Sequence, residues 1–165
     1  MVRHVLATSL TTEYNLFFAF ASPLFFEHPL RNPFNHEERF RIDLDDHQLR
    51  VVTGTAEWEY LRRNIRPCVG DIGDGPLESE FFDIDPQRGI QVALMAHEVV
   101  FIPFGHEGDA AAAERSVVVA FVSASHGHVV SVMQVHLQRR TFVINRTFRF
   151  YQNEGELLKR CMYRH

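Results

Sequence analysis

Short runs of apolar residues, separated by turn-forming residues, make up most of this chain. The clearest run is residues 40–44, in which Phe40, Ile42 and Leu44 alternate with charged residues. Alternation with a period of two indicates a strand with one buried face. Runs of similar composition predict further strands at 15–20, 24–30, 49–52, 81–84, 90–94, 98–104, 116–123, 129–137 and 142–151. Many short strands with few helical segments are typical of an antiparallel β-sandwich.

Turn residues mark the ends of two predicted strands. Asn32 and Pro33 follow the run at 24–30. Because proline cannot donate a ladder hydrogen bond and asparagine tolerates turn geometry, that strand should end before them. Pro103 and Gly105 should end the run at 98–104 for the same reason.

A tight hairpin is predicted in the second half of the chain. The segment Ser125-His126-Gly127-His128 separates residues 116–123 from residues 129–137. Glycine adopts positive φ without steric cost, and tight hairpin turns need such a residue. These two runs should therefore form the strongest strand pair of the sheet.

Helical structure is expected in only two places. Thr55 resembles an N-cap for a short helix over residues 56–62, which carries the single Trp. Asn153 with Glu156 three residues later resembles a capping box for a closing helix over residues 154–161. The first twelve residues are ambiguous, since their apolar spacing suits a helix end or a strand.

The chain is predicted to form one domain over residues 1–165. Residues 67–79 contain three glycines and two prolines, and we expect an exposed loop there. Neither flank of this loop has enough strands for a complete sandwich, so the loop is no domain boundary. The fifteen phenylalanines favour a sheet with a large aromatic core. The expected core and structural residues are Phe26, Asn32, Pro33, Phe40, Trp58, Phe104, Phe148 and Phe150.

Charge is unevenly distributed along the chain. The net charge is −4, but residues 1–114 carry −10 and residues 115–165 carry +6. One interpretation is a basic face that docks onto an acidic partner. The other is that the arginines simply line solvated strand faces, and the sequence leaves both open. The arginines that would form a partner-binding surface are Arg62, Arg63, Arg139, Arg140, Arg146 and Arg149.

No complete catalytic or metal-binding motif is present in the sequence. His126-x-His128 falls across a glycine turn and has no nearby Cys or carboxylate to complete a tetrahedral site. His97-Glu98 and His106-Glu107 lack the second His of a zinc protease motif. The acidic residues after Asp43 do not match a calcium loop. We therefore expect no enzyme activity, no metal and no cofactor.

The two cysteines, Cys68 and Cys161, stand apart from any Cys-x-x-Cys pair. Secreted domains of this size usually carry an even, spaced set of cysteines, so a reducing, cytoplasmic compartment is expected. The sequence contains no long apolar run and no signal-peptide pattern, so we expect no membrane insertion. A net acidic chain without aromatic RNA-binding motifs argues against nucleic-acid binding.

One acidic motif has two interpretations. Residues 80–84 (Glu-Phe-Phe-Asp-Ile) follow an acidic loop and resemble the double-Phe peptides that dock onto major-sperm-protein domains. In the alternative, Phe82 and Ile84 point into the core of this domain, as large apolar residues at a strand start usually do.

Several segments, in order along nearly the whole chain, resemble the nephrocystin-4 family. The most specific is residues 25–36 (FFEHPLRNPFNH), which is similar to that family's strand-turn-strand signature. The other matching segments are residues 9–13, 40–45, 49–52, 57–58, 100–104, 143–151 and 157–160.

The resemblance implies an immunoglobulin-like sandwich of the major-sperm-protein or PapD type. It further implies a module of a longer scaffold at the base of the cilium or flagellum, in the transition zone or basal body. Its implied partners are other scaffold proteins of that region, such as nephrocystin-1. The expected function is therefore a non-catalytic protein-interaction module. A purely structural spacer domain in a cytoskeletal protein is the alternative.

Overall fold

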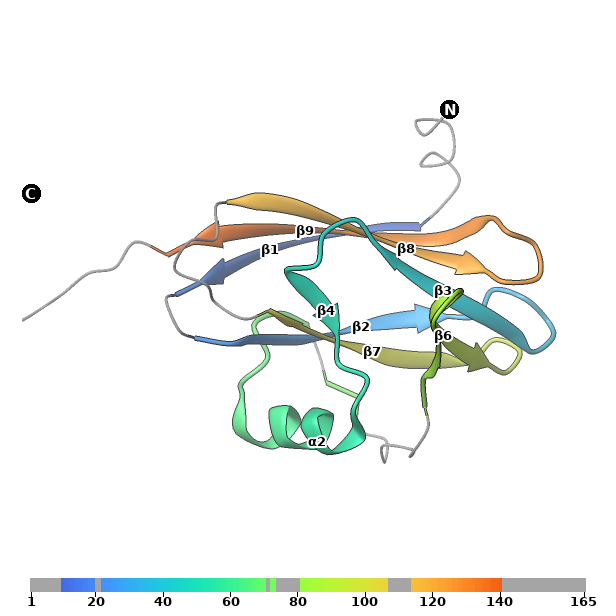
Figure 1. Ribbon diagram of the computed structural model, residues 1–165, viewed down its shortest axis with the longest axis horizontal. Coiled ribbons are helices and arrows are strands. Elements are labelled where there is room, and N and C mark those ends of the chain that lie inside the picture. Colours follow the sequence, from blue (N-terminus) through green and yellow to red (C-terminus); the bar gives the residue numbers. More distant parts are fainter. Residues whose placement is uncertain (1–9, 20–21, 71, 74–80, 107–113, 141–165) are drawn as a thin grey trace, which may run out of the picture.

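The chain folds into two facing β-sheets with one helix against the smaller sheet (Figure 1). The computed structural model describes residues 10–19, 22–70, 72–73, 81–106 and 114–140. The larger sheet has six strands in the order β1-β9-β8-β3-β6-β5, and the smaller has three in the order β2-β7-β4. The elements are β1 (Leu10–Phe18), β2 (Leu24–Arg31), β3 (Glu38–Leu44), β4 (Leu49–Val51), α2 (Thr55–Asn64), β5 (Asp83–Asp85), β6 (Gly89–Leu94), β7 (Val99–His106), β8 (Arg115–Ser123) and β9 (Val129–Arg139). The predicted β-sandwich is confirmed.

The large sheet contains one parallel pair. β1 runs alongside β9 in the same direction, from Leu10 opposite Ser131 to Phe18 opposite Arg139. The other strand pairs of both sheets are antiparallel, as predicted. This pair is the exception to the antiparallel pairing that the sequence predicts. A period-two pattern reports which face of a strand is buried and carries no information on the direction of its neighbour.

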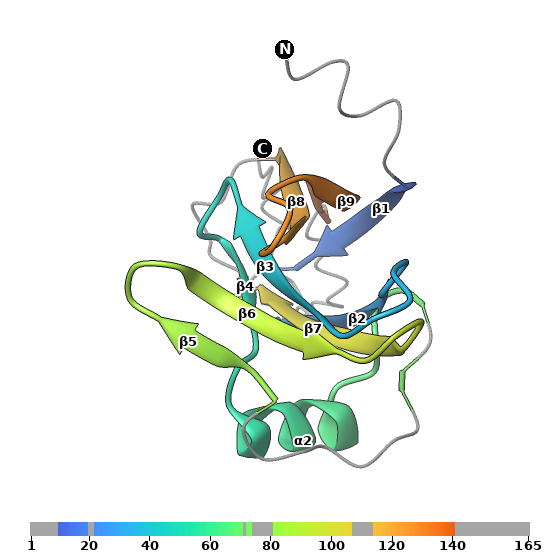
Figure 2. The same ribbon diagram turned by 90° about the vertical axis from the view of Figure 1, so that its right-hand side faces the viewer.

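Both faces of β2 are covered, which explains its nearly unbroken apolar run. Phe26 stacks on Phe104 and His28 stacks on Phe121 of β8, so these side chains lie between the sheets. Glu27 points the opposite way and contacts α2. Figure 2 shows α2 below the small sheet, on the side away from β8 and β9. The small sheet thus forms the middle of three layers.

The residues expected in the core occupy different positions. Phe26, Phe40 and Phe104 are completely buried, and Trp58 is 3% exposed. Trp58 lies on α2 and covers the outer face of the small sheet. Phe148 and Phe150 lie outside the described residues.

The pair Asn32-Pro33 ends β2, as predicted, and only the Asn is buried. The Asn32 amide donates to the carbonyls of His36, Leu94 and Met95 at 2.9–3.1 Å. Its own side-chain oxygen accepts from the Phe34 N–H. Asn32 therefore ties the β2–β3 loop to the β6–β7 turn, while Pro33 is exposed and contributes only the turn.

Helix α2 begins with a different cap from the one predicted. Thr55 is its first residue, and Gly54 is the N-cap with no side-chain cap hydrogen bond. The Gly54 carbonyl accepts the first helical hydrogen bond, from the Trp58 N–H at 2.9 Å. The helix also continues to Asn64, beyond the predicted 56–62, and the Ile65 N–H still donates to the Leu61 carbonyl at 2.9 Å.

Several strand boundaries also differ from the prediction, and those of β7 and β5 are the most instructive. β7 continues through Pro103 to His106, so proline does not end it. The Pro103 carbonyl accepts from the Val52 N–H at 3.0 Å, just past the end of β4. Since the N and O of a strand residue point to the same side, the missing N–H lies where no ladder partner is needed. β5 is shorter than predicted and starts only at Asp83.

The hairpin between β8 and β9 is confirmed, with Gly127 at φ 71°. The predicted strand at 142–151 and the predicted helix at 154–161 lie outside the described residues. Of the loop predicted at 67–79, the structure describes residues 67–70 and 72–73, all exposed or half-buried.

Candidate functional site

The arginines predicted to bind a partner do not lie on one surface. Arg62 and Arg63 are on α2, below the small sheet, whereas Arg139 and Arg140 are at the end of β9 in the large sheet (Figure 1). Arg146 and Arg149 lie outside the described residues. The two groups are separated by the small sheet, so they cannot contact one partner surface as a single patch.

Arg62 is an internal structural residue. Its Nε donates to Glu27 Oε1 at 2.7 Å and its Nη2 donates to Oε2 at 3.1 Å. The guanidinium also lies 5.0 Å from the centre of the Trp58 ring, a cation–π distance. The Arg62 side chain is only 16% exposed. Its charge is paired inside the domain, so its guanidinium is less accessible to a partner than that of an exposed arginine.

Glu27 is the residue around which this internal site is built. Its side chain is completely buried, and besides Arg62 it accepts from Trp58 Nε1 at 2.6 Å and from the Gly73 N–H at 2.8 Å. A buried carboxylate is stable only when its oxygens are fully hydrogen-bonded and its charge is balanced. These contacts supply both conditions and fasten α2 and the 67–79 loop to β2.

Arg63 faces solvent on the other side of α2. Its side chain is 78% exposed, and its only ion pair among the described residues is a 3.8 Å contact with Glu59 on the same helix. Tyr60 next to it is 62% exposed. Exposed ion pairs of this kind contribute little to stability. Arg63 therefore remains available for contact with another molecule.

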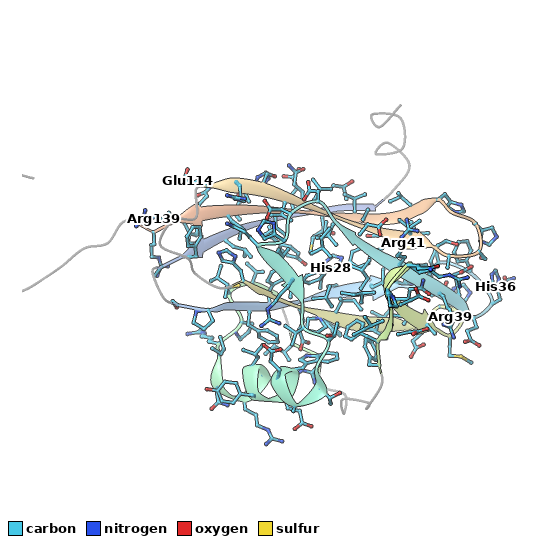
Figure 3. All side chains as sticks on the ribbon, in the orientation of Figure 1. His28, His36, Arg39, Arg41, Glu114 and Arg139 are labelled. Atoms are coloured by element: carbon cyan, nitrogen blue, oxygen red, sulfur yellow. The ribbon has the colours of Figure 1, made fainter. Side chains whose placement is uncertain are left out.

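Arg139 and Arg140 form the exposed basic end of the large sheet, which we call the arginine end. Both side chains are exposed, and the Arg140 N–H donates to the Phe18 carbonyl at 2.8 Å. Phe17, on the neighbouring strand, is 52% exposed. Figure 3 shows Arg139 and Glu114 at this end and His36 and Arg39 at the opposite end. The arginine end thus combines cations with an exposed aromatic ring.

The opposite end of the sandwich carries a group of stacked rings, which we call the histidine cluster. The Phe34 ring stacks on His36 and on His126, with centroid distances of 5.4 and 5.2 Å, and lies 6.1 Å from the His128 ring. The cluster joins the β2–β3 loop to the β8–β9 hairpin. His126 and His128 are exposed on the hairpin, and the sequence analysis did not predict their contact with Phe34.

The buried carboxylate of Glu38 lies next to the histidine cluster and binds the β8–β9 hairpin. Its side chain is 3% exposed and accepts from the Ser125 hydroxyl, the Ser125 N–H and the Arg39 N–H. Burial alone would raise the pKa of Glu38, but these hydrogen bonds and the neighbouring His126 outweigh it and lower the pKa. The shallow depression beside it is lined by polar residues that include His36 and Ser125.

The described residues contain no group of three or more His, Cys, Asp or Glu side chains with metal-binding geometry. The closest imidazole contacts of Glu38 are 3.4 Å to His126 and 3.8 Å to His36, which are ion-pair distances. His97 sits in the β6–β7 turn at φ 61°, and His106 is buried with its Nδ1 2.9 Å from the Gln48 carbonyl. Neither histidine belongs to a group with metal-binding geometry among the described residues.

The acidic residues at the end of β3 and just after it hold the chain in place. Asp43 makes a two-pronged ion pair with Arg41, with both distances 2.7 Å. Asp46 accepts from the Gln48 N–H and pairs with Arg115 at 2.6 Å. The hydrogen bond from Gln48 and the Arg115 charge lower the pKa of Asp46. These oxygens are occupied by protein donors.

Cys68 lacks the features of a reactive thiol. Its Sγ donates to the Phe25 carbonyl at 3.2 Å, and desolvation raises its pKa. A catalytic cysteine needs the opposite shift, because the thiolate is the nucleophile.

The acidic double-Phe motif is only partly free. Phe82 is 9% exposed, and Phe81 packs edge-on against Trp58 at 5.5 Å. Ile84, which the alternative interpretation placed in the core, is 60% exposed on β5. Docking of this motif onto another domain would require Phe82 to leave its place beside Trp58.

Sequence reasoning missed Glu27, Gly73 and the Phe34 stack. A signal for Glu27 was present, since it is the only acidic residue in the apolar run 24–30 and a charge there needs a buried partner. No local signal identifies Arg62 as that partner, because the two are 35 residues apart.

No helix in the described ranges is long and apolar enough to cross a bilayer.

Comparison with known proteins identifies a family. Residues 12–143 match the family model described as NPH4 Ig-like domain 1. The chain is 27% identical to nephrocystin-4 of Xenopus laevis and 23% identical to nephrocystin-4 of Homo sapiens, with 98% of this chain aligned in each case. It spans about 13% of the length of each relative. The sandwich is therefore immunoglobulin-like, and the chain belongs to the family of the first Ig-like domain of nephrocystin-4.

Proposed function

We propose that this domain is a non-catalytic protein-interaction module of a scaffold at the base of the cilium, in the transition zone or basal body. The observation that carries the proposal is the match to nephrocystin-4, which runs through 98% of this chain. The resemblance in sequence motifs points to the same family. The proposed partners are other scaffold proteins of that region, including nephrocystin-1-like proteins, and the proposed location is the cytoplasmic side of the ciliary base.

The surface chemistry supports a binding role at the arginine end. Arg139 and Arg140 place two cations at the end of β9, on the strand next to the exposed Phe17, and arginine and aromatic residues are enriched at protein interfaces. Fixed positive charge also speeds the encounter with an acidic partner. Arg63 and Tyr60 on α2 offer a second, smaller surface of the same composition.

The test is to tag the product of the endogenous full-length gene and image it in ciliated cells beside a basal-body marker. Concentration of the tagged protein at the ciliary base is the expected result. A diffuse cytoplasmic signal in cells with normal cilia would count against the proposal. Mass spectrometry of proteins captured with the tag would then show whether transition-zone scaffold proteins are recovered.

A further inference from the structure

The sandwich has four edge strands, and they differ in how much of their backbone is available. β4 and β5 have only three residues each. The outer edge of β2 is partly occupied, since Cys68 donates to the Phe25 carbonyl through both its N–H and its Sγ. β1 has nine residues and pairs with β9 alone. Among the described residues, β1 is therefore the longest open edge.

The hydrogen bonds between β1 and β9 show which backbone groups face outward. The Phe18 carbonyl accepts from the Arg140 N–H, so Phe18 directs its backbone groups toward β9. Successive strand residues point their N–H and C=O to alternate sides. Glu13, Asn15 and Phe17 therefore direct theirs away from the sheet. Such a row of groups is a template for pairing with another extended chain.

The described residues of β1 carry none of the sequence features that usually block edge-to-edge pairing. Residues 10–18 contain no proline, lysine or arginine. Their register with β9 is unbroken from Leu10 to Phe18, so no β-bulge twists the edge away. Glu13 carries the single charge of the strand. Natural proteins protect long edges by these means, so an unprotected one marks a place where a partner strand pairs.

The surroundings of the edge determine the chemistry of the partner. A strand added beside β1 would lie about 5 Å from it and about 10 Å from β9. Near Phe17 it would meet an exposed ring, and just beyond it the side chains of Arg139 and Arg140. At the other end it would meet Glu13. An apolar residue beside Phe17 and carboxylates near the arginines satisfy this arrangement.

We propose that the outer edge of β1 binds an extended, acidic segment of a partner protein by β-strand addition, with its carboxylates at the arginine end. This inference rests on the proposed interaction function and gives it a site and a ligand class. Main-chain hydrogen bonds to Glu13, Asn15 and Phe17 supply the affinity, and the two arginines select for acidic sequences.

The first test is amide hydrogen exchange on the whole chain, with and without synthetic peptides. The probe is a ten-residue peptide of alternating valine and threonine with three glutamates at one end, made with the glutamates first and with the glutamates last. The control peptides carry three lysines instead. In the free protein the amides of Glu13, Asn15 and Phe17 should exchange at least tenfold faster than those of Tyr14 and Leu16. One of the acidic peptides should slow the three fast amides at least tenfold, and the lysine peptides should not.

Two outcomes of this experiment would overturn the proposal. Slow exchange of the three amides in the free protein would mean that another part of the chain already covers the edge. Equal protection by the glutamate and lysine peptides would mean that the arginines do not select the ligand.

Variants give an independent check. Asn15→Pro removes one outward N–H, and proline is tolerated at such a position on an edge strand. Its matched control is Asn15→Ala, which keeps the N–H. Peptide protection should be lost only in the proline variant, with both melting temperatures close to that of the parent. Equal binding by both variants would refute the edge as the site.

The double variant Arg139→Glu, Arg140→Glu tests the charge selectivity separately, without changing the backbone of β1. It should reverse the preference toward the lysine peptides, and an unchanged preference for the acidic ones would refute the charge assignment. Failure of the edge-binding proposal can be distinguished from failure of the proposed ciliary function. Failure of peptide binding in a protein that still concentrates at the ciliary base removes only the edge assignment. A diffuse protein that binds the acidic peptide removes only the ciliary role.

Discussion

The Glu27 site and the β1 edge are opposite solutions to the placement of polar groups. At Glu27 a fully buried carboxylate receives hydrogen bonds from Trp58, Arg62 and Gly73, all within the domain. At β1 the backbone groups of alternate residues point outward, with no strand partner among the described residues. The Glu27 arrangement contributes to stability, since loss of a donor would leave an uncompensated buried charge. The β1 edge is suited to binding, because its outward backbone groups bond to water until another chain takes the place of that water.

The largest difference between the two regions is expected for Glu27→Ala. The substitution leaves the Arg62 guanidinium and the Trp58 N–H without their buried acceptor, and losing one member of a buried pair typically destabilises by about 3–5 kcal/mol. We expect a loss of that size in the free energy of unfolding, measured by urea denaturation. The matched control is Glu13→Ala on the β1 edge, which should change it by less than about 0.5 kcal/mol. Equal effects would show that the two regions do not differ as described.

A second large effect is expected from pH. Burial lowers the pKa of His28 from 6.5 to about 4, and its Nδ1 lies 3.1 Å from the Tyr14 hydroxyl. The unfolded state then binds more protons than the folded state between these two values, so stability is full above pH 6.5 and falls as the pH drops toward 4. The expected loss is about 3 kcal/mol. Urea unfolding from pH 7 to pH 4 measures it.

The comparison for His28 is His28→Phe, which keeps a ring against Phe121 and removes the titrating group. This variant should lose much less stability than the parent between pH 7 and pH 5, whatever its stability at pH 7. A parallel decline in both proteins would assign the pH dependence to other groups.

Gly73→Ala should have an intermediate effect. A Cβ at this position would lie 2.9 Å from Phe101 Cδ2 and 3.1 Å from Arg62 Nη2, so the ring and the guanidinium would have to move. Crowding of this kind costs about 1–3 kcal/mol. Thermal unfolding should show a lower melting temperature than that of Gly54→Ala, whose Cβ would meet only Glu57 at 3.8 Å. Identical melting temperatures would place Gly73 away from the Glu27 site.

The smallest effect on stability is expected at the arginine end. Because Arg139 and Arg140 are exposed, reversing both charges should change the free energy of unfolding by less than about 0.5 kcal/mol. Capture of partner proteins by the tagged full-length protein should nevertheless weaken, and Arg63→Glu serves as the comparison on α2. Undiminished capture would favour the alternative function, a purely structural spacer.

Most of the strands were predictable because burial leaves a local pattern in the sequence. Phe40, Ile42 and Leu44 alternate with charged residues, and β3 lies where this pattern predicts it. Gly127 identified the hairpin of β8 and β9 because its positive φ is a local requirement. The boundaries of β7 were missed because the effect of Pro103 depends on where β4 ends, which is not a local property.

The sites were less predictable than the strands, because they depend on pairs far apart in the chain. Arg62 was assigned to a partner surface, and its pairing with Glu27 appears only once α2 is placed against β2. The same holds for Phe34, which meets His126 only in the folded sandwich. Arg139 and Arg140 were predicted from charge alone, and the structure adds Phe17 on the neighbouring strand and the edge of β1.

The parallel pairing of β1 with β9 has a mechanical consequence. Because the two strands run in the same direction, the chain enters the described sandwich at one end and leaves it at the other, about 30 Å away (Figure 1). Tension applied through flanking polypeptide would pull β1 and β9 past each other and load all of their hydrogen bonds together in shear. Such a ladder resists force better than one that peels apart bond by bond. The described sandwich should therefore resist tension applied between the start of β1 and the end of β9.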